Sequence, residues 1–307
     1  MANVTTVREY LLLGFSEVRE LQLVHLLVYL LALTGNLLIF VVTAFNRRLH
    51  TPMYFFLRHL SVLDLSLISV TVPKSISNAV INSRSISSAR CGLQVLFFTF
   101  CACSEVGILM AMSYNRYVAI CWPPCYDVIM APGACGKMAL ASWLSGQLMG
   151  ILHVSNIFSL PFCGPAMIHH FFCDVPQVLK LVCPGDTMGV VGVICLIVTV
   201  AFFSLILIIY SYVSIFWALL RMPSTEGRPK AFSTCLPHLV VVTLFLSSGG
   251  FEYLNPVPDS PSLPDFLLPV FYAIVPPSLN RVIYSLRNRD IKSALGEAFR
   301  GKGICLG

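Results

Sequence analysis

The sequence predicts an all-α membrane protein: a bundle of seven membrane-spanning helices, with an extracellular N-terminus and a short amphipathic helix after the last span. Three observations carry this prediction. Of the 307 residues, 57% are apolar and only 11% are charged, against about 25% charged residues in a soluble domain. The apolar residues form runs long enough to cross a bilayer, which takes about 20 residues per helix. The basic residues gather on one side of these runs. This composition excludes a soluble enzyme, a nucleic-acid binder and a disordered chain.

Seven segments are apolar enough to span, and they belong to one domain covering residues 1–307. Their approximate ranges are 21–45, 55–80, 91–117, 134–157, 187–220, 231–254 and 266–287. The run lengths favour helices, because the strands of a membrane barrel alternate in polarity over about ten residues. After the last span, apolar residues spaced by three and four between basic residues predict an amphipathic helix over 289–300 on the inner leaflet.

The basic residues place the N-terminus outside the cell. With this orientation, fourteen of the twenty Lys and Arg residues lie at cytosolic ends and loops, and six lie on the outer side. Positive charge is retained in the cytosol, so we expect a multi-pass protein of the plasma membrane with a cytosolic C-terminus. The N-x-S/T sequon at Asn3 then lies outside, where glycosylation takes place.

Four cysteines fall on the outer side of this arrangement. They are Cys91, at the outer end of the third span, and Cys163, Cys173 and Cys183, between the fourth and fifth spans. Because the extracellular space is oxidising, four cysteines predict two disulfides among three alternative pairings. The other eight cysteines lie in the membrane or on the cytosolic side, where we expect them to stay reduced.

Several motifs, in order along the chain, resemble those of mammalian olfactory receptors. They are residues 49–57 (LHTPMYFFL), 112–121 (MSYNRYVAIC), 211–212 (SY), 230–235 (KAFSTC) and 284–288 (YSLRN), together with 11–16 (LLLGFS) and 160–165 (LPFCGP). The resemblance extends from about residue 3 to residue 300. It implies a rhodopsin-like G-protein-coupled receptor that binds small volatile organic ligands. It also implies activation of a heterotrimeric G protein of the stimulatory, olfactory class, which raises cAMP.

The resemblance implies a cysteine pairing as well, Cys91 with Cys173 and Cys163 with Cys183. The first bridge would hold the long loop against the third span as a lid over the ligand cavity. The family needs no cofactor, and its partners besides ligand and G protein are membrane lipids rather than nucleic acid. The residues themselves carry no enzyme signature, since no group of side chains has catalytic or metal-ligand spacing.

The predicted ligand cavity lies in the outer half of the bundle. Phe98, Thr99, Ala102 and Cys103 share one face of the third span, a pattern that also fits ordinary helix packing. The resemblance favours ligand contact. His153 is either a polar anchor for the ligand or a packing histidine with its hydrogen bonds satisfied. The remaining wall positions are Val193, Ile197 and Val200 on the fifth span, Gly249 and Tyr253 on the sixth, and Val270 and Ala273 on the seventh. An apolar wall with few polar groups suits small hydrophobic molecules.

Charged and aromatic residues nearer the cytosol are predicted to form a switch. Asp64 and Glu105 lie at mid-depth, where charges are costly. They either hold an allosteric sodium ion or form a hydrated network in which one of them is protonated. By the resemblance, Arg116 engages the G protein. The other coupling and switch positions are Asn115, Tyr117, Tyr212, Lys230, Arg281 and Tyr284.

Three departures from the family's pattern leave alternatives open. Asn115 stands where Asp normally precedes Arg-Tyr, so Arg116 loses a charged restraint, and we expect raised basal signalling. Arg281 stands where the seventh span normally has Pro, and it would either pair with Asp64 or Glu105 or reach down towards the lipid headgroups. The first span also looks about one turn short. One alternative is therefore a receptor-like chain with impaired folding or signalling. An ion-coupled transporter is the rival from another class, although no internal repeat supports it.

Overall fold

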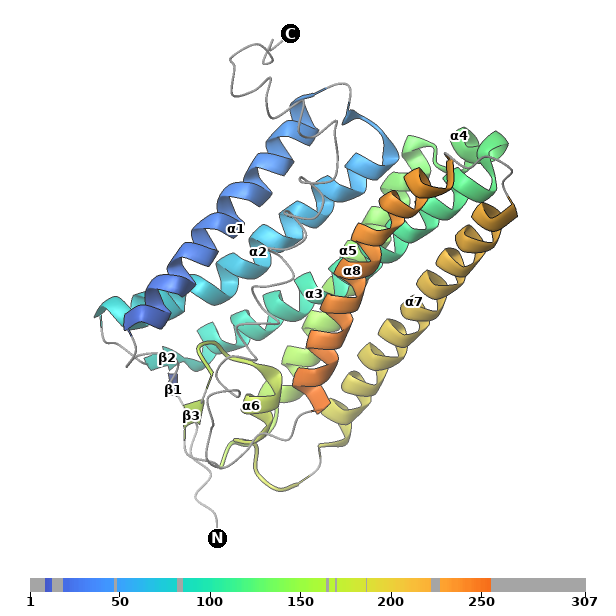
Figure 1. Ribbon diagram of the computed structural model, residues 1–307. Helices are drawn as coiled ribbons and strands as arrows, with labels where there is room; N and C mark the ends of the chain where they lie inside the picture. The colour runs from blue at the N-terminus through green and yellow to red at the C-terminus, as the bar shows by residue number, and fades with distance from the viewer. Residues whose placement is uncertain are drawn as a thin grey trace.

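Six long helices pack side by side in the computed structural model (Figure 1). The structure describes residues 9–12, 19–46, 49–81, 85–163, 166–168, 170–185, 187–221 and 227–254. The long helices are α1 (Arg19–Phe45), α2 (Pro52–Ile81), α3 (Ser88–Cys121), α5 (Pro132–Phe158), α7 (Met188–Arg221) and α8 (Gly227–Leu254). Each begins and ends within four residues of the range predicted for the first six spans. The predicted seventh span, 266–287, and the amphipathic helix, 289–300, lie outside the described residues.

The two ends of the bundle carry different short elements (Figure 1). One end holds β1 (Glu9–Leu12), β2 (Ser85–Ser87), β3 (Met167–Ile168) and helix α6 (Val175–Leu179). It also holds both disulfides, so it is called the disulfide end. The other end holds the 3-10 helix η2 (Pro123–Cys125) and helix α4 (Tyr126–Ile129). It is called the α4 end.

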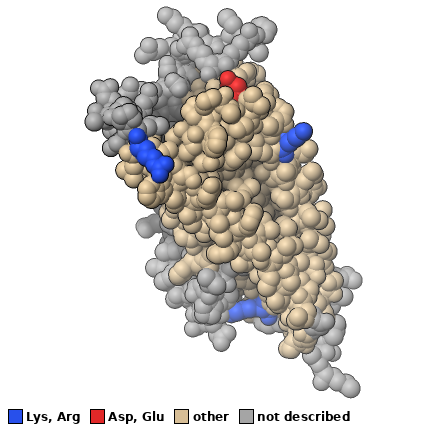
Figure 2. Space-filling view, turned by 90° about the vertical axis from the view of Figure 1, so that its right-hand side faces the viewer, with Lys and Arg blue, Asp and Glu red and all other residues tan. Residues whose placement is uncertain are grey.

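The helix surfaces fit a lipid environment. Within the described residues, segments of α1, α2, α3 and α7 are long and apolar enough to cross a membrane, and α8 has a shorter apolar stretch, His238–Phe251. Over its 34 residues α7 carries a single charged side chain, Arg221, in its last turn. Figure 2 shows a wide band of one face without Lys, Arg, Asp or Glu, and charged side chains towards both ends. A soluble surface would need charges in that band.

Small residues bring α3 and α5 into close contact. A Cβ added at Gly146 of α5 would collide with the Ser104 hydroxyl and the Phe100 carbonyl of α3. One turn further along, a Cβ at Gly150 would lie 2.8 Å from the Leu96 carbonyl oxygen. Glycine at these positions lets the two backbones approach, which is how membrane helices gain packing energy without a hydrophobic drive. We call this contact the α3–α5 seam.

Three short strands at the disulfide end were not predicted by the all-α interpretation. β1 pairs antiparallel with β2, with Tyr10 opposite Ile86, and parallel with β3, with Leu11 opposite Met167. Tyr10 is fully buried and its ring lies edge-on to Phe162, with 6.0 Å between ring centroids. Strands of two to four residues are too short to show a period in the sequence, and their pairing joins distant parts of the chain.

Buried apolar clusters fill both halves of the bundle. The larger one lies towards the α4 end, where α2, α3 and α7 contribute residues such as Leu60, Met112 and Ile215. A second cluster, which includes Tyr10, lies beneath the loop at the disulfide end. Polar side chains are also buried towards both ends of the bundle, and predicted site residues are among them.

Candidate functional site

Two disulfides hold the long loop between α5 and α7 at the disulfide end. Cys91, in the first turn of α3, is bonded to Cys173, and their Cα atoms are 5.4 Å apart. Cys163 is bonded to Cys183 within the loop, with Cα atoms 4.8 Å apart. The structure therefore contains both bridges that the family resemblance implied. Spacing alone had left three pairings open.

Gln94 adds a polar clasp that the sequence interpretation missed. Its Nε2 donates to the Val70 carbonyl of α2 at 3.1 Å, and its Oε1 accepts from the Cys173 backbone N–H at 3.1 Å. Gln94 is buried, so both bonds are made away from water. One amide thus joins α2, α3 and the loop beside the disulfide. Gln94 lies one turn after Cys91 on the same helical face, and this spacing could have indicated from the sequence that its side chain faces the loop.

The loop places aromatic rings against the outer half of α3. Phe172 is fully buried, and its ring centroid lies 5.3 Å from that of Phe98. Phe171 packs on Phe172 at 4.8 Å. These rings share a buried cluster with Leu67 and Val72 of α2. Phe98, a predicted ligand contact, therefore faces the loop and α2.

Two of the predicted ligand contacts are buried polar side chains without a hydrogen-bond partner within the described part of the chain. One is the Thr99 hydroxyl of α3. The other is His153 of α5, which is fully buried and in which both ring nitrogens are unpartnered. A buried polar group without a partner is costly, which favours the interpretation of His153 as a polar anchor for a ligand. Ala102 and Cys103 follow on α3, and both are half-buried.

The predicted wall positions on α7 and α8 differ in burial. Val193 is buried and Ile197 is half-buried. Val200 is 43% exposed, and α7 has no buried residue between Val193 and Ser204. Val200 therefore differs from Val193 in burial, and its place in the wall stays a prediction. On α8, a Cβ added at Gly249 would meet nothing within 4 Å, which agrees with a position that provides space.

Two carboxyl groups are buried in the middle of the bundle. Asp64 of α2 and Glu105 of α3 are both fully buried, and both act electrostatically on the buried thiol of Cys101. They therefore lie in the same region of the interior. Among the residues that the structure describes, no group of three or more His, Cys, Asp or Glu side chains is arranged to hold a metal ion.

Towards the α4 end, Arg116 is buried against α8 and α2. Its guanidinium contacts the Cys235 thiol of α8, and one of its nitrogens lies 4.0 Å from the Met53 sulfur. The neighbouring Asn115 accepts a hydrogen bond of 2.9 Å from the Tyr126 hydroxyl of α4. Burial raises the pKa of the Tyr126 phenol, so this hydroxyl keeps its proton and remains the donor.

A second contact at this end joins α7 to α8. The Tyr212 hydroxyl and His238 Nδ1 are 2.7 Å apart, and His238 is fully buried. Sequence interpretation named Tyr212 but missed its partner, although His238 follows directly on the 230–235 motif. Tyr117, also predicted for the switch, is half-buried and accepts a bond of 3.1 Å from Trp122 Nε1. It lies beside Tyr210 of α7, away from the Tyr212–His238 pair.

Several predicted site residues cannot be placed. Lys230 and Tyr253 belong to α8, but their side chains are outside the described set. The positions outside the described residues altogether are Asn3, Val270, Ala273, Arg281 and Tyr284.

Comparison with solved structures identifies the fold. The chain is similar to squid rhodopsin, with a TM-score of 0.73, 16% identity, and coverage of 94% of this chain and 87% of that one. The fold is therefore that of a rhodopsin-like seven-helix receptor.

Sequence comparison then gives the family. The olfactory receptor family model matches residues 25–302. The human olfactory receptors 14J1, 14L1 and 14A16 are 52%, 50% and 48% identical to this chain, over 96%, 95% and 98% of it and 93%, 91% and 99% of their own lengths. The chain belongs to the olfactory receptor family. It is an odorant-sensing G-protein-coupled receptor of the membrane and not an enzyme, as the sequence predicted, and the comparisons give no support to an impaired receptor-like chain or a transporter.

Proposed function

We propose that this receptor lies in the plasma membrane with the disulfide end outside. There it binds small hydrophobic volatile molecules in the outer half of the bundle, and it activates a G protein of the stimulatory, olfactory class to raise cAMP. The observation that carries the binding part is the pair of unpartnered buried polar groups, Thr99 and His153. They lie in the half of the bundle that the disulfide-bonded loop covers.

The chemistry of this region favours a ligand with one polar atom and an apolar body. The Thr99 hydroxyl can donate or accept a hydrogen bond, and so can a neutral imidazole at His153. The rest of the wall is formed by apolar groups such as Phe98, Ala102 and Val193. Such a site suits alcohols, aldehydes, ketones and esters. Tyr253, Val270 and Ala273 remain expected contributors from the sixth and seventh spans.

Coupling is proposed for the α4 end. Arg116 is buried against α8 in this structure, so a movement of α8 away from α3 would expose it to a G protein. Tyr212 and His238 link α7 to α8 across the same region, and they would have to rearrange in that movement. Lys230, Arg281 and Tyr284 stay expected members of this set.

An allosteric sodium ion between Asp64 and Glu105 is part of the proposal. Two buried carboxyl groups in one region of the bundle would suit a hard cation with oxygen ligands. Arg281 is the competing partner expected from the sequence. The outward orientation of the disulfide end has support from the two disulfides, since these form in oxidising compartments. It also makes Asn3 accessible to glycosylation.

A cAMP reporter assay in cultured cells, run with a panel of volatile compounds, tests the proposal. An agonist that raises cAMP should lose potency on Thr99→Ala and on His153→Phe, each by about tenfold for one lost hydrogen bond in a buried site. Leu93→Ala is the matched control, because Leu93 is on α3 but exposed. Equal potency in all variants would contradict the binding site. A response through a different second messenger would contradict the assigned G protein.

A further inference from the structure

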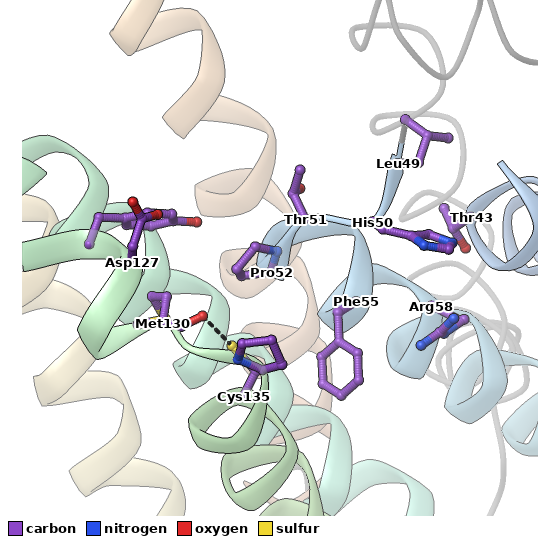
Figure 3. Close-up of a pocket in the computed structure, with 12 residues that line it drawn as sticks. Thr43, Leu49, His50, Thr51, Pro52, Phe55, Arg58, Asp127, Met130 and Cys135 are labelled. Atoms are coloured by element: carbon purple, nitrogen blue, oxygen red, sulfur yellow. Dashed lines mark hydrogen bonds between the residues drawn. The ribbon is translucent and has the colours of Figure 1, made fainter. Parts of the chain in front are cut away.

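A cavity of about 540 Å³ lies at the α4 end of the bundle, between α1, the first turns of α2, the short helix α4 and the start of α5. Figure 3 shows its lining side chains, which come from two segments of the sequence, 43–58 and 126–135. None of the residues assigned above to ligand binding or to the sodium site lines it. The cavity therefore needs its own explanation.

Arg58 supplies the charge of this cavity. It lies six residues after Pro52, the first residue of α2, which is about 9 Å along the helix axis. The side chain is half-buried, and its guanidinium lies over the Phe55 ring at 5.6 Å. Within the described part of the chain, the structure shows no ion pair between Arg58 and a carboxylate. A cation at this depth in a membrane protein calls for an anion or for the headgroup layer.

The neighbours of Arg58 divide the cavity into two sides. Figure 3 shows His50 and Thr43 on the same side as Arg58, and Asp127 on the opposite side. The His50 ring is held by a contact of 3.2 Å between Nε2 and the Ala44 carbonyl oxygen, so Nε2 is the donor there. Between the two sides lie apolar groups, including Pro52 and Phe55. The cavity thus offers a cationic side next to an apolar floor.

We propose that this cavity binds an anionic phospholipid, with the lipid phosphate on Arg58 and part of an acyl chain on the apolar floor. The guanidinium fork matches phosphate oxygens in geometry and charge. A free phosphate would satisfy Arg58 but leave the apolar floor uncovered, and an apolar molecule would leave Arg58 unpaired. The exposed carboxylate of Asp127 across the cavity favours a headgroup with a single negative charge. In the proposed orientation this lipid belongs to the inner leaflet.

The bound lipid would lie next to the coupling region. Tyr126 lines the cavity and also donates its hydrogen bond to Asn115, the residue before Arg116. The lipid therefore contacts a side chain that is one hydrogen bond away from the switch. This link is independent of which odorant binds at the other end.

Native mass spectrometry of the purified full-length receptor in detergent tests the proposal, with added phosphatidylglycerol as the probe. We expect phosphatidylglycerol to be retained in preference to phosphatidylcholine, and Arg58→Gln to reduce its apparent affinity about tenfold, the effect of one lost charge-assisted hydrogen bond. Arg221→Gln is the matched control. Arg221 also lies at this end and stacks on an aromatic ring, Trp217, at 5.9 Å, but it does not line the cavity.

Two further arms keep the test independent of the fold of the variant. Glycerol 3-phosphate, offered without acyl chains, should not be retained; retention as strong as that of the lipid would overturn the lipid assignment. Photoactivatable phosphatidylglycerol on the wild-type receptor should label residues 43–58 and 126–135. Labelling only elsewhere, or equal loss of lipid in Arg58→Gln and Arg221→Gln, would overturn the site.

Discussion

The two ends of this receptor are held together by different kinds of interaction. At the disulfide end, two covalent bridges, three paired strands and the buried Gln94 clasp connect the loop to α2 and α3. At the α4 end, the helices share the larger apolar cluster, and their polar connections are single side-chain contacts, such as Tyr212 with His238 and Tyr126 with Asn115. The disulfides of the first set break only by reduction, whereas each hydrogen bond of the second set costs about 1 kcal/mol to exchange.

In the proposed function, this difference separates binding at the disulfide end from signalling at the α4 end. A lid that is fixed by disulfides keeps the shape of the outer half constant, so the ligand meets a prepared surface. An end held by exchangeable contacts can adopt a second arrangement when a ligand shifts the population of states. Changes at the disulfide end should therefore affect folding, and changes at the α4 end should affect basal signalling while the fold persists.

The largest effect is expected from breaking the bridge between α3 and the loop. Cys173→Ser should cost about 2–5 kcal/mol and remove most of the receptor from the cell surface. Surface staining and thermal unfolding in detergent measure it. Cys195→Ser is the control, because Cys195 is free and exposed on α7. Normal surface levels of Cys173→Ser would show that the disulfide end is not the rigid one.

A smaller loss of folding stability is expected from a change at the α3–α5 seam. Gly146→Ala places a methyl group against the Ser104 hydroxyl and the Phe100 carbonyl, and overpacking of this kind costs about 1–3 kcal/mol. The same change at Gly136 meets nothing within 4 Å, so it should be neutral or slightly stabilising. Thermal unfolding of both variants measures the contrast, and equal melting temperatures would rule out a tight seam.

At the α4 end, Tyr212→Phe removes the hydrogen bond to His238 without changing the ring packing. Losing this hydrogen bond should destabilise, by about 1–2 kcal/mol, the arrangement in which α8 covers Arg116. Basal cAMP per receptor at the surface should therefore rise. Tyr210→Phe serves as the control, since Tyr210 is exposed on the same helix. Basal signalling that is unchanged or lower in Tyr212→Phe would place the switch elsewhere.

The smallest effect is expected for Asn115→Asp. A carboxylate would accept the Tyr126 hydroxyl bond more strongly than the amide does and would restrain Arg116 by charge. We expect about 1 kcal/mol in favour of the resting arrangement, seen as a several-fold fall in ligand-independent cAMP. Combining it with Tyr126→Phe should restore part of the signal. Equal basal levels at equal surface expression would contradict this role of Asn115.

The helices were predictable because each is a local property of the sequence. The apolar run of α7 places its ends within one residue of the predicted range 187–220. The partners within the sites were not predictable in this way. Gln94 meets Cys173 across 79 residues, and Tyr212 meets His238 across 26. No periodicity in the sequence encodes such contacts, and the disulfide pairing itself came from the family resemblance.

Val200 illustrates a second kind of limit. Its spacing from Val193 puts both on nearly the same face of an ideal helix, yet one is buried and the other is exposed. Burial depends on whether a neighbour lies at that height along the helix, and the spacing of residues on one helix does not contain this information.

The strand pairing of β1 also sets an order of assembly during biosynthesis. Glu9–Leu12 precedes all six long helices, but its parallel partner, Met167–Ile168, is made only after the fourth of them, α5, has been synthesised. Until then β1 can pair only with β2, so completion of the three-stranded sheet is a late event. An epitope tag joined close to Glu9 would interfere with this late pairing. A spacer between the tag and Glu9 should therefore improve the yield of mature receptor.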